Sequence, residues 1–312
     1  IAQIRDVTVT NSPRNRFTGN TIRDSRRAFN FLFAHRSLVD RNHLEQNSTG
    51  IIALNSDGLI IRNNRILHAM DASGAGIALK ETSAALVIGN EIVHCAHGIM
   101  ADSPMNPLNR IVFIDNFVAH NITGVYFYGA KGGHIAIGNT FRSNLWPVTI
   151  IGDGDPLDDT WTGNYWDGYE GFDQDQDGFG DRPYDLLAYA DRIWLETPAA
   201  RFFRNSPVLE LLDFLERLAP FSAPSLILRD TAPRMKPTRT YNSHPLACFD
   251  KWRVATLPSK RAARGLNCQR IDGRYSNLHV ATLMADGPSF LQGVKFRGRV
   301  LFSVDCIWGL TC

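Results

Sequence analysis

The stretch VIGNEI, residues 87–92, contains the motif that decides the fold of this chain. An Asn stands three residues after one apolar residue and two residues before another. The same arrangement recurs along the chain, with successive Asn residues separated by 22, 22, 26, 26, 23 and 25 residues. The Asn positions are Asn20, Asn42, Asn64, Asn90, Asn116, Asn139 and Asn164. A repeat of this length indicates a solenoid.

Each repeat unit contains short segments in which apolar residues alternate with other residues, separated by turn residues. One such segment is an apolar-x-apolar triplet that Gly precedes in several units, as at Ile77–Leu79 after Gly76. Period-2 alternation indicates strands, and units of about 22–26 residues are too short for helical repeats. The Leu signature of leucine-rich repeats is absent. We therefore predict an all-β fold, a right-handed parallel β-helix solenoid.

The Asn repeat has a physical explanation in this fold. Strands of adjacent coils lie about 4.8 Å apart, so equivalent side chains stack above one another. An Asn at a bend then donates its amide NH₂ to the Asn carbonyl of the next coil, which satisfies polar groups that are costly to bury alone. The seven Asn are predicted to form this structural ladder. The alternative, ordinary Asn-x-apolar turn chemistry, does not explain the near-constant register.

Composition divides the chain into four predicted regions. Residues 1–160 hold the coils, 161–204 an aromatic cap and an acidic loop, 205–236 a helical docking segment, and 237–312 an atypical tail. The tail has three Lys and eight Arg against four Asp and no Glu, a net charge of +7, and it holds four of the five Cys. Because the whole chain carries +2, the rest carries −5, which does not favour binding to a phosphate backbone. We predict no nucleic-acid partner and interpret the tail as non-native, as after a reading-frame change.

An acidic loop follows the last coil. Four carboxylates lie within residues 172–181, at Asp173, Asp175, Asp177 and Asp181. Oxygen ligands at alternating positions, followed by Gly178, match the first half of a calcium-binding loop. The twelfth position holds Tyr184 rather than Glu, so the loop is not a complete EF-hand. We predict a structural calcium ion here, and the alternative is a solvated acidic loop.

Three segments together resemble the NosD family. They are the Asn-cornered coils, the run GNYWDGYEGFDQDQDGFGDRPYD (163–185) and the run NSPVLELLDFLERLAPFSAPSLILRDTAPRM (205–235). The resemblance covers about residues 1–235, and the stretch around 205–224 is its most discriminating part. NosD-like chains begin with a signal peptide and further coils. The start at Ile1 is therefore interpreted as a fragment or a processed form.

The resemblance also implies a function and partners. NosD-like proteins are periplasmic and work with an ABC-type ATPase and a membrane permease. They serve assembly of the copper–sulfur centre of nitrous oxide reductase in denitrification, with a copper chaperone as a further partner. The resemblance therefore predicts a non-enzymatic accessory protein that contacts copper only transiently.

Residues 205–219 independently show the pattern of an amphipathic helix. Ser206 is a suitable N-cap, Pro207 a suitable first residue, and Pro220 ends the pattern. Apolar residues follow at helical spacing in between. The resemblance predicts that this helix docks on the permease through Leu211, Leu212, Leu215 and Leu218. The alternative is a lid packed on the solenoid.

A column of histidines is the strongest candidate for metal chemistry. Four residues after successive ladder positions stand His68, His94 and His120. If the register holds, three imidazoles align along the solenoid axis. Other donors lie close in sequence, namely Met70, Cys95, His97, Met100 and Met105. Imidazole, thioether and thiol bind copper, so we predict a transient copper site at the three His; the alternative is an inert stack.

No catalytic residues are predicted. The chain has no P-loop and no nucleophile elbow, so ATP hydrolysis belongs to another subunit. One alternative is a carbohydrate-active β-helix, a polysaccharide lyase, epimerase or sugar-binding module, with Tyr126, Tyr128 and Trp146 along a groove. Another is a structural repeat that binds protein partners.

Overall fold

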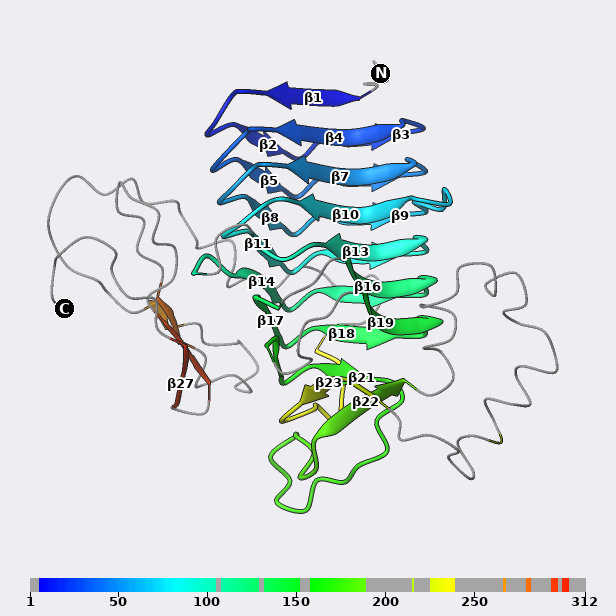
Figure 1. Ribbon diagram of the computed structural model, residues 1–312, viewed down its shortest axis with the longest axis vertical. Helices are drawn as coiled ribbons and strands as arrows, with labels where there is room; N and C mark the ends of the chain where they lie inside the picture. Colours follow the sequence, from blue (N-terminus) through cyan, green and yellow to red (C-terminus); the bar gives the residue numbers. More distant parts are fainter. Residues whose placement is uncertain are drawn as a thin grey trace, which may run out of the picture. The chain divides into compact units, whose positions relative to one another are not determined.

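The computed structural model is a stack of β-strand coils (Figure 1). It describes residues 6–104, 108–128, 132–151, 158–188, 215, 225–238, 266–267, 279–281, 293–296 and 299–302. The chain separates into two compact units, one comprising Ile1–Met105 and Arg110–Tyr241, the other Asn106–Asn109 and Asn242–Cys312.

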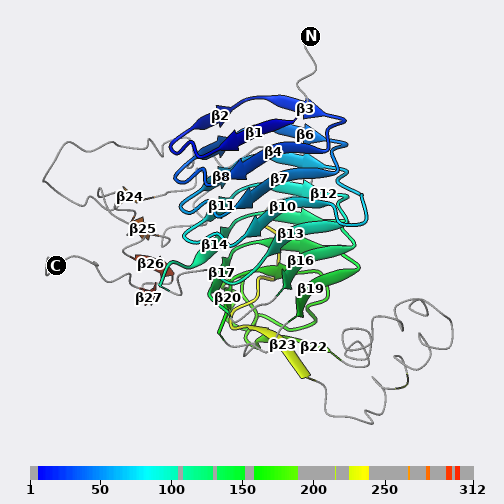
Figure 2. The same cartoon turned by 45° about the horizontal axis from the view of Figure 1, so that its top comes forward.

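Three sheets form the sides of the first unit, and successive coils add one strand to each sheet in parallel (Figure 2). Sheet A consists of β1 (Val7–Thr10), β4 (Arg27–Leu32), β7 (Thr49–Leu54), β10 (Ala75–Lys80), β13 (His97–Ala101), β16 (Thr123–Tyr128) and β19 (Trp146–Ile151). Sheet C consists of β3 (Thr21–Arg23), β6 (His43–Glu45), β9 (Arg65–Leu67), β12 (Glu91–Val93), β15 (Phe117–Ala119), β18 (Thr140–Arg142) and β21 (Tyr165–Trp166).

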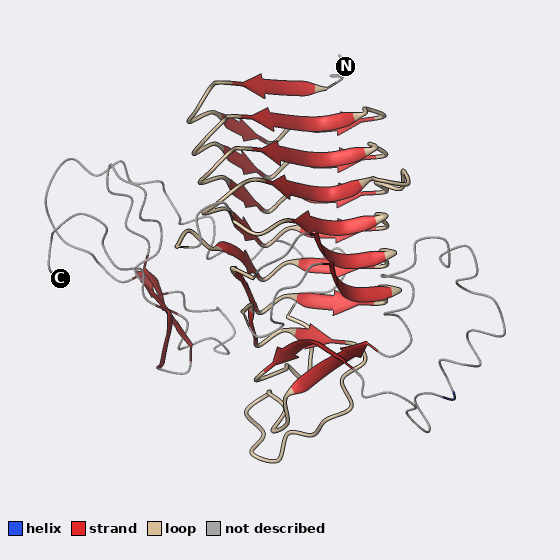
Figure 3. Cartoon of the chain, in the orientation of Figure 1, coloured by secondary structure: helices blue, strands red, loops and turns tan. Residues whose placement is uncertain are grey.

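In each coil the strand of sheet B comes after that of sheet A and before that of sheet C. Two further strands, which follow the seventh coil in the chain, also belong to sheet B. Its coil strands are β2 (Arg16–Thr18), β5 (Leu38–Asp40), β8 (Ile60–Arg62), β11 (Leu86–Ile88), β14 (Ile111–Ile114), β17 (His134–Ile137) and β20 (Thr160–Thr162). At its end, β23 (Ser225–Asp230) pairs in parallel with β20, and β22 (Tyr184–Ala188) pairs antiparallel with β23. The predicted all-β parallel solenoid is confirmed, and Figure 3 shows strands and loops throughout the described coils.

The second unit holds a small antiparallel sheet. Its strands are β24 (Leu266–Asn267), β25 (His279–Ala281), β26 (Gly293–Phe296) and β27 (Arg299–Phe302). The interpretation of this region as non-native stays a prediction.

Stacked columns of apolar side chains fill the solenoid. Each sheet turns every second residue inward, as alternation along a strand requires. In sheet C the inward column is at most 2% exposed, at Ile22, Leu44, Ile66, Ile92, Val118, Phe141 and Trp166. Burying one such side chain contributes roughly 1.5–3 kcal/mol, so the stack supplies most of the driving force.

The glycines before the sheet A triplets have a packing role. A Cβ placed on Gly76 would lie 2.7 Å from the carbonyl oxygen of Gly98 and 2.5 Å from Ile92 Cγ2. A Cβ placed on Gly50, Gly98 or Gly124 would lie equally close to a carbonyl oxygen of the next coil. At these four positions a side chain would collide with the backbone of the next coil, which explains why they hold Gly.

The seven predicted Asn lie in one column at the bend between sheets B and C. Each amide nitrogen donates to the next Asn Oδ1 at 2.8–3.0 Å, from Asn20 through Asn164. Each Oδ1 also accepts the backbone N–H of the preceding ladder Asn, as in Asn90 to Asn116 at 3.0 Å. The sequence did not reveal how the ladder ends. It ends on Asp230, whose Oδ2 accepts from Asn164 Nδ2 at 2.9 Å.

Asp230 marks the start of an eighth coil. Strand β23 continues sheet B, and Arg234 forms a parallel bridge with Tyr165 at the end of sheet C. Residues 167–224 are therefore an insertion between the seventh and eighth coils. Aromatic rings close the stack beside it, with Trp166 stacked on Tyr184 at 5.0 Å.

Most of the predicted helical segment 205–219 lies outside the described residues. Its one described residue, Leu215, is helical and 43% exposed. No helix among the described residues is both long enough and apolar enough to cross a membrane.

Candidate functional site

The three predicted histidines lie side by side on the outside of the solenoid. His68 directly follows β9, His94 follows β12, and His120 follows β15, and all three are exposed. The rings of His68 and His94 have centroids 5.3 Å apart and an interplanar angle of 3°. Those of His94 and His120 are also 5.3 Å apart, at 19°. Sequence register alone therefore located a continuous imidazole column.

The backbone at this corner explains part of the residue choice. His68, His94 and His120 have φ of 59°, 56° and 56°, in the left-handed region. The equivalent positions of other coils, Asp24, Gln46 and Ser143, have the same conformation. His, Asn and Asp tolerate this region better than most residues. Turn geometry thus accounts for polar residues here, but not for three consecutive imidazoles.

The middle ring of the column resists protonation. Burial lowers the pKa of His94, and the neighbouring charges of His120 and His68 lower it further. A neutral imidazole presents a lone pair, which is the form that binds a metal ion. His94 therefore remains available as a ligand under conditions where an ordinary surface His begins to protonate.

Imidazole is a suitable donor for copper, but the column is not a closed metal site. With metal–nitrogen bonds of about 2.0–2.1 Å, two nitrogens on one ion lie at most about 4.2 Å apart. The centroids of adjacent rings are 5.3 Å apart and the rings are close to parallel, so equivalent nitrogens of two rings in the same orientation lie farther apart than that limit. An ion would bind one ring of the column, or two after a ring rotation. This arrangement suits brief contact with an ion better than permanent retention.

Sulfur donors nearby do not complete the column. Cys95 is fully buried, and burial raises the pKa of its thiol to about 12, so it remains a protonated core residue. Met70 is 53% exposed beside His68 in sequence, whereas His97 and Met100 belong to strand β13 of sheet A. Met105 lies outside the described residues.

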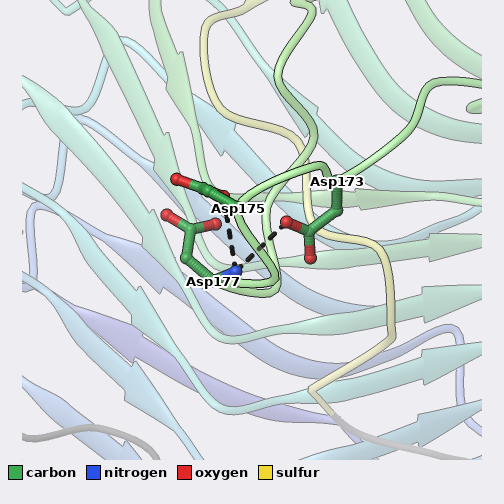
Figure 4. A group of neighbouring side chains, drawn as sticks. All are labelled: Asp173, Asp175 and Asp177. Atoms are coloured by element: carbon green, nitrogen blue, oxygen red, sulfur yellow. Dashed lines mark hydrogen bonds between the residues drawn. The ribbon is translucent and has the colours of Figure 1, made fainter.

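The acidic loop brings three of its four predicted carboxylates together (Figure 4). Ligand oxygens of Asp173, Asp175 and Asp177 all lie within 4.8 Å of one another. Asp173 Oδ1 and Oδ2 accept the N–H groups of Asp177 and Gly178, at 3.1 and 2.8 Å. Asp181 instead accepts the N–H of Gln174 at 2.6 Å. The calcium assignment stays a prediction.

Of the predicted docking leucines, Leu211, Leu212 and Leu218 lie outside the described residues. Leu215 is exposed, so its side chain is accessible. Docking through this segment stays a prediction.

Sequence reasoning missed a charged cluster at the start of the His column. On the outer face of sheet C, Glu45 contacts Arg23 at 2.7 Å and His43 at 3.1 Å. It also lies 4.0 Å from His68. The available signal was the alternation in HLE, residues 43–45, which places His43 and Glu45 on one side of a strand.

A second Asn column, also missed, follows five residues after some ladder positions. Asn121 Nδ2 donates to Asn144 Oδ1 at 2.9 Å, and Asn121 Oδ1 accepts the N–H of Cys95 at 2.8 Å. The spacing Asn116–Asn121 and Asn139–Asn144 was visible in the sequence. This column stabilises the corner that carries the histidines.

Of the aromatic residues of the carbohydrate alternative, Tyr126 and Tyr128 lie on the outer face of sheet A, whereas Trp146 is the first residue of β19 and lies outside their columns. The rings of Tyr126 and Tyr128 are 6.1 Å apart at 25°, and His97 lies 4.8 Å from Tyr126. Burial, with the charges of Asp102 and Glu81, raises the pKa of Tyr128. These side chains form a half-buried aromatic strip with carboxylates beside it.

Comparisons with known proteins assign the coils to a family. The family model described as "Periplasmic copper-binding protein (NosD)" matches residues 1–171. A Pseudomonas aeruginosa protein named "Probable ABC transporter binding protein NosD" is 30% identical over 193 residues, covering 57% of this chain and 43% of that relative. A Stutzerimonas stutzeri protein of the same name is 28% identical over 127 residues, covering 39% of this chain and 28% of that relative. This chain therefore spans less than half the length of these two relatives.

Among solved structures, a double mutant of the periplasmic alginate epimerase AlgG is 21% identical to this chain, with a TM-score of 0.34. That match covers 47% of this chain and 43% of the epimerase. The family model, by contrast, matches more than half of the chain and contains the Asn ladder and the whole His column. The chain belongs to the NosD family of periplasmic copper-binding proteins.

Proposed function

We propose that this chain acts in the periplasm as the binding component of an ABC-type transporter and serves copper–sulfur centre assembly in nitrous oxide reductase. Family membership supports the location and the link to copper, and the names of the relatives support the link to a transporter. The ATPase and permease supply energy and passage through the membrane. A copper chaperone and the reductase are the proposed donor and acceptor.

The observation that carries this proposal is the exposed imidazole column. His68, His94 and His120 stack at intervals of 5.3 Å within the matched residues 1–171. The rings are accessible, and burial together with the neighbouring charges lowers the pKa of His94, which favours its neutral form. Copper is the cargo, and the column is the surface on which it is received. The proposed role is non-enzymatic.

Complementation of a denitrifying strain without its own NosD tests this proposal. A His68→Ala, His94→Ala, His120→Ala variant is expected to lower the copper content and activity of the reductase at least tenfold relative to the unchanged chain. The matched control is Gln46→Ala with Ser143→Ala, which changes the same corner column in coils that lack imidazole. Normal copper loading in the triple variant would refute a role for the column.

A second candidate function has one specific observation in its favour. The Tyr126 and Tyr128 strip has the form of a surface on which sugar rings stack. A glycan array with the purified chain separates the two functions. The accessory role predicts no signal above background. A carbohydrate-active protein would bind a defined glycan, and a Tyr126→Ala, Tyr128→Ala variant would no longer bind that glycan.

A further inference from the structure

A chain of hydrogen bonds runs along the solenoid at the bend between sheets A and B. Asn55 Nδ2 donates to Glu81 Oε2 at 2.9 Å. The backbone N–H of Glu81 donates to both carboxylate oxygens of Asp102, at 3.0 and 2.8 Å. His134 Nε2 lies 2.9 Å from the carbonyl oxygen of Asp102, and His134 Nδ1 lies 3.0 Å from Asp159 Oδ1. These five residues belong to five successive coils, the third to the seventh, so the bonds connect all of them.

His134 and Asp159 stand in a column that is apolar in the coils before them. The register partner of His134 is Ile111 of β14, and the column continues through Ala85 and Leu59. Those three residues are at most 1% exposed. The side chains of His134 and Asp159 are 1% and 4% exposed. An ionisable pair thus occupies positions where three earlier coils have aliphatic core side chains.

The acceptors around the His134 ring determine how many protons the ring carries. The carbonyl oxygen of Asp102 can only accept, so Nε2 carries a proton. A second proton lies between Nδ1 and Asp159 Oδ1, because two lone pairs facing each other at 3.0 Å would repel. Oδ1 also accepts the backbone N–H of His134 at 2.9 Å, which favours a carboxylate and places the second proton on Nδ1. The ring is therefore an imidazolium, and the buried pair has no net charge.

The ring of Phe127 lies flat against this imidazolium. The two ring centroids are 3.9 Å apart, the interplanar angle is 9°, and Phe127 is completely buried. A cation over an aromatic face is attracted to it, most strongly where both are desolvated. Loss of the second proton would leave a buried carboxylate without its counter-charge, which is costly. The carboxylate and the aromatic face thus both stabilise the charged ring.

Further titratable groups surround the pair. Burial raises the pKa of Asp102 and the charge of Glu81 raises it further, whereas the charge of His134 lowers it. Tyr128, the last residue of β16, has Asp102 and Glu81 as charged neighbours. The imidazolium therefore acts on a group of side chains that reaches the outer face of sheet A.

We propose that the His134–Asp159 pair is a proton-dependent clamp, which ties the fifth, sixth and seventh coils together while both ring nitrogens carry protons and releases Asp102 when one proton is lost. The proton passes to solvent, and the net charge of the pair changes from zero to −1. The remaining proton stays on Nδ1, because a carboxylate is a stronger acceptor than a carbonyl oxygen. Nε2 then directs a lone pair at the carbonyl oxygen of Asp102, and that hydrogen bond is lost. Since the Asp102 carboxylate holds the N–H of Glu81, the release extends to the fourth coil.

This clamp does not depend on the proposed function. It lies at the bend between sheets A and B, whereas the imidazole column follows the strands of sheet C. Substitutions in the pair leave His68, His94 and His120 unchanged. The two proposals can therefore fail separately.

Nuclear magnetic resonance of the full chain, labelled with nitrogen-15, tests the clamp. The ring signals of His134 are assigned by their absence from a His134→Ile variant, which restores the residue type of Ile111. The unchanged chain is expected to carry protons on both ring nitrogens and to lose one of them as the pH is raised. In the same step, exchange of the Glu81 amide proton is expected to become severalfold faster relative to that of Asn116, which lies in the ladder at the other bend.

Asp159→Asn removes the counter-charge at nearly constant size. Its His134 ring is expected to carry a single proton at neutral pH, and its Glu81 amide to lose the step in exchange. The matched control is Asp158→Asn, since Asp158 is the exposed neighbour of Asp159 and its loss is expected to change neither signal.

Circular dichroism confirms that each variant is folded. If Asp159→Asn does not fold, His134→Ile gives the same test, because it has no ring proton to lose and should show no step at Glu81. The clamp is refuted if His134 of the unchanged chain carries only one ring proton wherever the chain is folded. It is also refuted if the step at Glu81 persists in Asp159→Asn or His134→Ile.

Discussion

Asn116 uses every hydrogen-bonding group of its amide. Its Oδ1 accepts from Asn90 N and Asn90 Nδ2, both at 3.0 Å. Its Nδ2 donates to Asn139 Oδ1 and to the carbonyl of Val87, both at 2.9 Å. The side chain is completely buried. One residue thus satisfies buried polar groups on both neighbouring coils.

Asn116→Ala is expected to lower the free energy of unfolding by roughly 3 kcal/mol or more, because each buried donor or acceptor left without a partner costs about 1–3 kcal/mol. Urea unfolding followed by circular dichroism measures the change. Thr8→Ala on β1 is the control, since Thr8 is exposed and its loss is expected to change stability by less than about 0.5 kcal/mol. Equal stabilities of the two variants would contradict the ladder as a source of stability.

Asp230 ends the ladder with a side chain that only accepts. Its two oxygens receive the N–H groups of Gly163, Asn164 and Ala232, together with Asn164 Nδ2 and Trp166 Nε1. Asp230→Asn places an NH₂ among these donors. We expect the free energy of unfolding, measured with urea at neutral pH, to fall by about 2 kcal/mol, although Asp and Asn side chains have nearly the same size. A neutral effect would show that an amide ends the ladder equally well.

The imidazole column makes a prediction about titration. Burial is the larger cause of the lowered His94 pKa, and the charges of His120 and His68 are the smaller ones. His120→Ala removes one charge and some burial, so the pKa of His94 is expected to rise toward its usual value. Nuclear magnetic resonance of the ring protons measures this shift. An unchanged or lower pKa in the variant would contradict electrostatic coupling along the column.

The same column affects stability as the pH changes. Because the pKa of His94 is lower in the folded state, the unfolded chain binds the proton more readily. The contribution of neutral His94 to the free energy of unfolding is complete above about pH 6.5, the pKa of His in the unfolded chain. It is lost as the pH falls from there through the lower pKa that His94 has in the folded state. His94→Gln is expected to reduce this part of the acid destabilisation.

The acidic loop, residues 173–181, is expected to bind calcium. Calcium is expected to raise the melting temperature of the chain, because binding to the folded state alone stabilises it by about 2.7 kcal/mol at one hundred times the dissociation constant. A variant with Asp173, Asp175 and Asp177 all replaced by Asn is expected to lose the response. Calorimetry without any calcium-dependent shift in the unchanged chain would leave a solvated acidic loop.

The first unit is a stack in which the described strands of each coil pair with those of the coils directly before and after it. Deletion of residues 90–115 removes one complete coil and places Asn116 directly after Gly89, so the ladder keeps its register. The shortened chain is expected to fold with a β-type circular dichroism spectrum and a cooperative but lower melting transition. Deletion of residues 90–102 removes about half a coil and is expected to prevent folding. Equal behaviour of the two deletions would contradict a repeat based on register.

The amino-acid sequence determined the periodic part of this structure. In a parallel stack, residues separated by one repeat length lie directly above one another. The spacing of Asn90 and Asn116 was therefore enough to predict their contact. The alignment of His68, His94 and His120 follows from the same register. Both features follow the length of the coil, the Asn through seven coils and the His through three, so a single sequence contains the information about them.

Only the tertiary structure decided the features that break the period. Asp230 follows Asn164 by 66 residues, because an insertion separates the last two coils, and no repeat spacing points to it. Cys95 and His94 are adjacent in sequence, yet a left-handed turn directs one into the core and the other into solvent. The contact of Glu45 with His68 likewise depends on how far two side chains reach across a sheet edge. The repeat length of the sequence specifies which residues of adjacent coils are neighbours. The direction of each side chain and the place of an insertion depend on packing, which the repeat does not encode.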